Sequence, residues 1–165
     1  MSAPSLVIHD SPEALAGAVA DALLARLAEL QAGGVEPHVG LTGGSIADAL
    51  HRALAERSEG SPVDWSRVHV WWGDERFVAS DSPDRNAGQA RAALLDHVQV
   101  DPAKVHEVPG SDEAADVDEA AAAYSATFGE HGPDRLDVLM LGIGPDGHVA
   151  SLFPGHPGLG VTGRV

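Results

Sequence analysis

Apolar residues recur along the chain in a spacing of three to four positions, which is typical of helices with one apolar face. Leucine and valine follow this spacing between residues 15 and 30, so a helix is predicted there. Ser11 and Pro12 suit its N-cap and first position, and Gly33-Gly34 suits its end. The same spacing predicts further helices at about residues 46–54, 84–98 and 114–128.

Short apolar runs between these helices predict strands at residues 6–8, 38–41, 68–72, 104–108 and 136–141. Strands that alternate with helices predict an α/β domain with an open, mostly parallel, doubly wound sheet of Rossmann-like type and helices on both faces. We expect residues 1–165 to form one such domain. Because residues 155–165 are glycine- and proline-rich and show no periodicity, we expect it to be incomplete at the C-terminus.

The first candidate binding loop, Thr42-Gly43-Gly44-Ser45, lies between a predicted strand and a predicted helix. The N–H groups of Gly43, Gly44 and Ser45, the Ser45 hydroxyl and the positive end of the helix dipole suit a phosphate group. A turn without a ligand explains the same residues equally well. The loop lacks the Gly-Lys-Ser/Thr of a Walker A motif.

A second loop, Gly73-Asp74-Glu75-Arg76, follows the strand predicted at residues 68–72. Three charged residues at the carboxyl end of a buried strand suit a polar site, because ligands of open α/β sheets bind beyond these strand ends. Arg76 has the geometry to hold a phosphate by paired hydrogen bonds. The alternative is a surface cluster of ion pairs.

The third loop, residues 142–148, follows the last predicted strand and contains Asp146 and His148. His148 is suited to proton transfer near neutral pH, and the alternative is an exposed histidine on a glycine-rich turn. The loop matches the dinucleotide pattern Gly-x-Gly-x-x-Gly, but Pro145 interrupts it and no acidic residue follows Gly147. Metal binding by Asp146, His148 and His156 lacks a supporting ligand spacing, so we expect no metal site.

The overall charge narrows the classes of partner. Acidic residues outnumber basic ones 25 to 10, which gives a formal net charge of -15 and argues against nucleic acid and anionic membranes. The chain has no cysteine and therefore no disulfide or thiol nucleophile. We see neither a signal peptide nor an apolar run of the ~18 residues that a membrane span needs, so we expect a cytoplasmic protein.

Together, three stretches resemble the superfamily of glucosamine-6-phosphate deaminases and 6-phosphogluconolactonases. They are residues 41–45, residues 72–76 with 81–86, and residues 144–155. The resemblance runs from about Leu6 to Phe153. Asp146, where deaminases have Asn, and the following Ser151-Leu152-Phe153-Pro154 favour the lactonase branch. Family members continue past the end of this chain and supply a lysine on the phosphate side, so the resemblance implies a fragment.

The resemblance implies hydrolysis of 6-phosphogluconolactone to 6-phosphogluconate, a step of the oxidative pentose phosphate pathway, without a cofactor. His148 would activate water, Asp146 or Asp74 would orient its imidazole, and Gly43, Gly44, Ser45 and Arg76 would bind the phosphate. One alternative is an amino-sugar-phosphate deaminase/isomerase in which Asp74 shuttles a proton. Another is a non-catalytic sugar-phosphate-binding module. As a fragment, the chain by itself is expected to be poorly stable or inactive.

Overall fold

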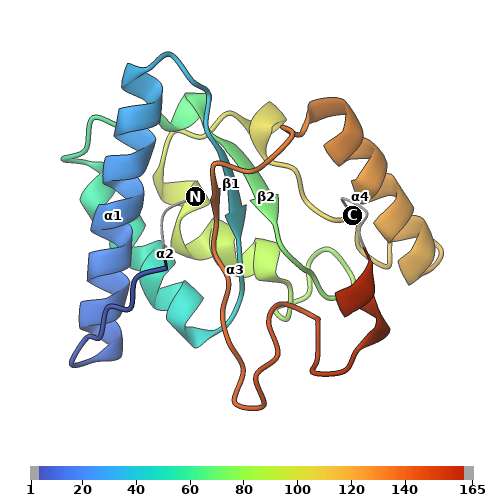
Figure 1. Cartoon of the computed structure of the whole chain (residues 1–165). Coiled ribbons are helices and arrows are strands. Elements are labelled where there is room, and N and C mark those ends of the chain that lie inside the picture. Colours follow the sequence, from blue (N-terminus) through green and yellow to red (C-terminus); the bar gives the residue numbers. More distant parts are fainter. Residues whose placement is uncertain (1–3, 162–165) are drawn as a thin grey trace.

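The computed structural model describes residues 4–161, which form a parallel sheet with helices on both faces (Figure 1). This arrangement confirms the predicted fold class. The elements in chain order are α1 (Pro12–Ala32), β1 (His38–Leu41), α2 (Ser45–Ser58), β2 (His69–Trp72), α3 (Asn86–Ala93), α4 (Val117–His131) and β3 (Val138–Leu139). Short 3-10 helices occur at Trp65–Arg67, Leu95–His97, Pro102–Lys104 and Pro157–Gly160.

The sheet has the strand order β2-β1-β3, and both pairings are parallel. All carboxyl ends of its strands therefore lie at one edge, where the three candidate loops begin. At the centre of the sheet, a Cβ on Gly40 of β1 would lie 2.5 Å from Leu139 Cδ1 and 3.1 Å from Leu136 Cδ1. Glycine at this position lets the two leucine side chains cross the middle strand.

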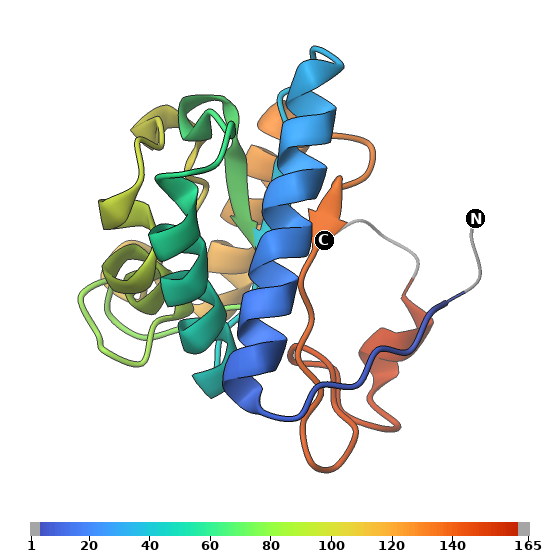
Figure 2. The same ribbon diagram turned by 90° about the vertical axis from the view of Figure 1, so that its left-hand side faces the viewer.

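The hydrophobic core lies on the face of the sheet covered by α1, α2 and α3 (Figures 1 and 2). Val39, Leu41, Val70 and Trp72 point into this core, as expected for alternate residues of two neighbouring strands. Leu27 and Leu54 of the covering helices are fully buried. Burial of each such leucine stabilises the fold by about 1.5–3 kcal/mol.

The opposite face of the sheet is covered by α4 (Figure 1). Trp71 packs there against Phe128, with ring centroids 4.9 Å apart, and against Tyr124 at 6.2 Å. The Tyr124 hydroxyl accepts a hydrogen bond from Trp72 N–H (2.9 Å) and donates one to Trp72 C=O (3.0 Å). The hydroxyl thereby satisfies both backbone groups of Trp72 on the outer edge of β2.

Four histidines gather on this face, at the ends of the strands remote from the candidate loops. The stacked rings of His38 and His69 lie 4.2 Å apart between centroids, and those of His106 and Trp71 lie 3.9 Å apart. His131 stacks on His106 at 5.7 Å. Burial is the largest cause that lowers the pKa of His38 and of His106 to about 4, so both are neutral at pH 7.

Two predicted strands are wrong. Leu6, Val7 and Ile8 are 67–87% exposed and lie in an irregular segment, because three β-prone residues do not form a strand without a partner edge. Residues 104–108 give only an isolated bridge, Val70 to Val105, after the 3-10 helix at Pro102–Lys104. The predicted strand at 136–141 shortens to the two residues of β3.

The predicted helices are present with shifted ends. Ser11 accepts the capping hydrogen bond from Ala14 N–H, and Gly33 ends α1, as predicted. The helix predicted at about 84–98 stops at Ala93, since the buried Leu94 leaves helical geometry, with φ of -137°. α4 begins three residues later than predicted, after the Asp116 N-cap. None of the helices within residues 4–161 is long and apolar enough to span a membrane.

Candidate active site

A pocket of about 410 Å³ lies at the carboxyl edge of the sheet, and all three candidate loops line it. Five residues predicted from the sequence border this pocket: Gly43, Gly44, Asp74, Arg76 and His148. Two other predicted residues, Ser45 and Asp146, do not line it. The volume is in the range of small-molecule sites.

The first loop connects β1 to α2. Gly44 has a φ of +100°, a conformation that favours glycine, and it is the N-cap of α2 without a side-chain cap. Ser45 is the first residue of α2 and is exposed. The structure thus places backbone of the loop at the pocket, next to the positive end of a helix dipole.

Gly43 also lets two loops approach each other closely. A Cβ on Gly43 would overlap with the side-chain amide of Asn86, the first residue of α3. Asn86 Nδ2 donates a hydrogen bond to Asp74 C=O (3.1 Å), so the amide lies between the first and second loops. The sequence analysis assigned no role to Asn86, because nothing in its local pattern points to such a distant contact.

A buried ion pair between Glu75 and Arg85 holds the second loop against the body of the protein. The Glu75 and Arg85 side chains are 1% and 2% exposed, with Oε2 and Nε 3.5 Å apart. Glu75 also accepts hydrogen bonds at 2.8 Å from Asn86 N–H and Ala87 N–H. These two N–H groups at the start of α3 have no partner within the helix, so Glu75 supplies one. Glu75 is therefore a structural residue, and its partner Arg85 was missed from the sequence.

Asp74, Glu75 and Arg76 all border the pocket, but only Glu75 has its side chain buried against Arg85. The Arg76 guanidinium is exposed, and its Nη1 donates to Asp84 C=O (2.7 Å), which fixes it at the pocket edge. Asp74 Oδ2 accepts a hydrogen bond from Ser151 Oγ (2.7 Å). The interpretation as a polar site therefore fits Asp74 and Arg76, and the interpretation as an ion-pair cluster fits Glu75.

The third loop presents His148 to the pocket with Asp146 behind it. His148 Nδ1 lies 2.5 Å from Asp146 Oδ1, and the same oxygen accepts a bond from His148 N–H (3.2 Å). These hydrogen bonds, the one from the His148 side chain first, lower the pKa of the Asp146 carboxyl. Because an ionised carboxylate only accepts hydrogen bonds, the proton of this contact belongs to Nδ1, so in the neutral form of the imidazole Nε2 is the nitrogen with a lone pair.

Two further contacts hold the His148 ring. It packs on Gly144, where a Cβ would overlap with the imidazole, and it lies 4.7 Å from the Phe153 ring between centroids. Gly144 N–H donates to His148 C=O (2.9 Å), and Gly147 has a φ of +88° in the turn. Gly144 and Gly147 allow the turn to fold back on itself, so that the His148 ring packs against the backbone of its own loop.

Residues 4–161 contain no group of three or more His, Cys, Asp or Glu side chains placed to hold a metal ion. His156 accepts a hydrogen bond from Gly158 N–H (3.0 Å) and caps the last 3-10 helix. Lys104 donates to Glu36 (2.8 Å) beside the histidine group, at the opposite end of the sheet from the pocket.

Comparison with known proteins agrees with this arrangement. The family model described as glucosamine-6-phosphate isomerases/6-phosphogluconolactonase matches residues 10–165, so the chain belongs to this family. The 6-phosphogluconolactonase of Streptomyces coelicolor is 44% identical, with 98% of this chain and 66% of that protein covered. That of Mycobacterium leprae is 38% identical, with 100% and 68% covered.

Solved structures give the same result for the fold. The 6-phosphogluconolactonase of Trypanosoma brucei superposes with a TM-score of 0.87 at 26% identity, covering 99% of this chain and 68% of that one. The enzyme of Thermotoga maritima gives 0.75 at 28% identity, covering 84% and 60%. The chain therefore spans about two thirds of the length of these relatives.

Proposed function

We propose that the protein hydrolyses 6-phosphogluconolactone to 6-phosphogluconate. The observation that carries the proposal is the Asp146–His148 pair, which presents an imidazole to the same pocket as Gly43, Gly44 and Arg76. A base and an anion site on one pocket are what hydrolysis of a phosphorylated ester requires. The similarity to proteins named 6-phosphogluconolactonase supports the choice of substrate.

In the proposed reaction, His148 Nε2 takes a proton from a water molecule as the water oxygen attacks the lactone carbonyl carbon. The tetrahedral intermediate then collapses with cleavage of the bond between this carbon and the ring oxygen. The imidazolium returns the proton to the departing ring oxygen, which becomes the hydroxyl of the open acid. Asp146 holds the tautomer that accepts a proton at Nε2 and stabilises the imidazolium.

The phosphate is remote from the reacting carbonyl and serves as the anchor. We assign its binding to the N–H groups of Gly43 and Gly44 and to the Arg76 guanidinium, which line the pocket, together with the N–H group of Ser45 at the start of α2. With its net charge of -15, this chain repels an anionic substrate, so local donors must provide the attraction. These steps use no cofactor.

An amino-sugar-phosphate deaminase/isomerase is the second candidate, and the position of Asp74 at the pocket favours it. There, Asp74 would move a proton between sugar carbons, and His148 would help to open the ring. In the structure, Asp74 Oδ2 accepts a bond from Ser151 Oγ, whereas His148 is oriented by the contact of its Nδ1 with Asp146. This difference supports hydrolysis.

The experiment follows acid release from freshly prepared lactone in a pH-stat, with spontaneous hydrolysis subtracted. The sequence alone predicted a chain that is poorly stable or inactive by itself, but all three loops already line one pocket within residues 4–161, so we expect release above the background. This release is lost in His148→Asn, while Gly129→Ala, a change on the outer surface of α4, has no effect. Ammonia release from glucosamine 6-phosphate is measured in parallel. Turnover of the amino sugar alone contradicts the proposal, and binding of 6-phosphogluconate without turnover of either compound indicates a binding module.

A further inference from the structure

The segment that carries His148, residues 141–161, is attached to the rest of the described chain by few hydrogen bonds. After Met140 N–H donates to Gly40 C=O (2.9 Å), the backbone hydrogen bonds of residues 141–161 are internal to that segment. They include the bonds between Gly144 and His148 and between Val149 and Leu152. Figure 1 shows this segment as a long extension below the sheet, and Ile143 within it is 79% exposed.

Within residues 4–161, one hydrogen bond joins this segment to the remainder of the protein. Ser151 Oγ donates to Asp74 Oδ2 at 2.7 Å, across 77 positions of sequence. Both residues line the pocket, and Ser151 follows His148 by three positions. A hydroxyl–carboxylate bond is charge-assisted and therefore stronger than a bond between neutral groups.

Asp74, the acceptor of the bond from Ser151, lies on a loop that other contacts hold in place. Its backbone carbonyl accepts from Asn86 Nδ2 (3.1 Å), and the next residue, Glu75, is buried against Arg85 and the start of α3. The loop after β2 is thus held by several bonds to the body of the protein, whereas the segment of the His148 turn is bonded to it through Ser151. The bond between Ser151 and Asp74 therefore fixes the position of the His148 turn relative to the loop after β2.

We propose that Ser151 is a positioning residue of the reaction, which acts through its hydrogen bond to Asp74 to hold His148 at the pocket. This inference rests on the proposed function of His148 as the base. Without the bond, the turn keeps its internal hydrogen bonds but loses its fixed distance to the phosphate anchor. A displacement of about 1 Å is enough to cost on the order of 100-fold in rate.

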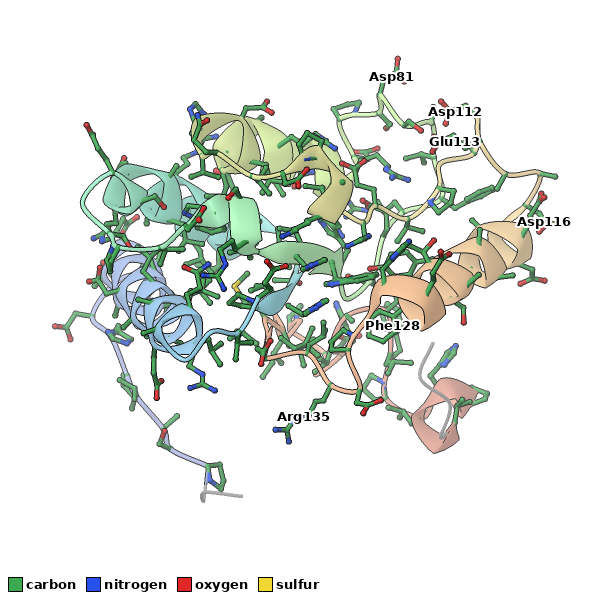
Figure 3. All side chains as sticks on the ribbon, turned by 90° about the horizontal axis from the view of Figure 1, so that it is seen from above. Asp81, Asp112, Glu113, Asp116, Phe128 and Arg135 are labelled. Carbon is green, nitrogen blue, oxygen red and sulfur yellow. The ribbon has the colours of Figure 1, made fainter. Side chains whose placement is uncertain are left out.

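The test compares Ser151→Ala and Ser151→Thr with the unchanged chain. Threonine keeps the hydroxyl, and its methyl group has room because Ser151 is exposed. The matched control is Ser80→Ala, which removes hydroxyl bonds to Asp112 (2.8 Å) and Glu113 (3.0 Å), two residues before α4 that do not line the pocket (Figure 3). Each variant is measured for kcat, KM and hydrogen–deuterium exchange of residues 141–153.

We expect Ser151→Ala to lower kcat by about 10- to 100-fold, to leave KM within about twofold, and to speed exchange in residues 141–153. Ser151→Thr is expected to keep kcat, KM and the exchange rate of the unchanged chain, and Ser80→Ala is expected to change none of the three. An unchanged kcat in Ser151→Ala, or equal losses in the alanine and threonine variants, overturns the inference. Slower turnover with unchanged exchange also overturns it, because Ser151 would then act on the substrate directly.

The two proposals fail in different ways. If the unchanged chain releases no acid above background, the proposed function is wrong, and the exchange measurement still tests the positioning effect. If the unchanged chain is active but Ser151→Ala matches it in rate, the proposed function stands and the role of Ser151 is wrong.

Discussion

The imidazole of His148 rests on the Cα of Gly144, in a contact that leaves no space for a Cβ. Gly144→Ala must therefore push the ring away from Asp146 or open the turn. We expect kcat to fall by at least about tenfold, with a small change in KM, because the phosphate anchor lies on other loops. Steady-state kinetics with the lactone check this.

The matched control is Gly129→Ala in α4, where an added Cβ meets no atom within 4 Å. This helical substitution is expected to leave kcat unchanged and to raise stability by about 0.5–1 kcal/mol. Equal kcat values for Gly144→Ala and the unchanged chain would show that displacement of the His148 ring does not affect turnover of the lactone.

His148→Asn tests the assigned base. Asparagine keeps much of the shape and hydrogen bonding of histidine but cannot take a proton near neutral pH. We expect a loss of about 10²–10⁴-fold in kcat, with binding of 6-phosphogluconate nearly unchanged by calorimetry. The rate of the unchanged chain should also decline as the pH falls, because imidazolium has no lone pair. An identical decline in the variant points to another base, and Asp74 is the first candidate.

Arg76→Ala tests the phosphate anchor. The guanidinium borders the pocket and is fixed by Asp84 C=O, so its removal should raise KM more than it lowers kcat. A lost charged contact corresponds to about 1–3 kcal/mol of binding free energy. Ser45→Ala should show a smaller effect, since Ser45 lies outside the pocket lining. A collapse of kcat at constant KM in Arg76→Ala would assign the arginine to the reacting carbonyl.

His51 is expected to make stability depend on pH. It is 2% exposed on α2, and burial lowers its pKa to about 4 against the model-peptide value of 6.5. Below pH 6.5 the unfolded chain binds a proton that the folded chain refuses, so the free energy of unfolding falls as the pH drops from about 6.5 to about 4. His38 and His106 act in the same direction.

The measurement is urea unfolding at pH 7.5 and pH 5 of the unchanged chain and of His51→Leu. Leucine removes the titrating group and the buried Nε2, which has no hydrogen-bond partner among residues 4–161. We expect the variant to gain on the order of 1–2 kcal/mol relative to the unchanged chain on going to pH 5. His9→Asn, near the N-terminus, serves as control. Parallel pH profiles for His51→Leu and the unchanged chain would contradict this effect.

The sequence was informative where structure is local. The helix of residues 12–32 follows from its leucine spacing and from Ser11 and Pro12, and the three loops follow from short apolar runs that end in polar turns. Parallel pairing then brings the loops to one pocket, so their meeting there was predictable. The Asp146–His148 contact joins residues two positions apart, so it is also a local feature that the sequence could indicate.

The rest depends on contacts between distant residues, which periodicity does not record. Glu75 and Arg85 look like surface charges in the sequence, yet they form the buried ion pair under the site. Ser151 carries no signal of its bond to Asp74. Residues 6–8 show the reverse error, because their apolar run predicts a strand that no neighbouring edge completes.

Tyr124 covers part of the outer edge of the sheet, on β2. An outer strand with unpaired N–H and C=O groups is a template on which a strand of another chain can add. On β2, His106 N–H donates to Val70 C=O (2.9 Å), and the Tyr124 hydroxyl occupies both backbone groups of Trp72. A single phenol from α4 thus closes the end of this edge nearest the pocket, so growth of the sheet into an aggregate is blocked there without an additional strand.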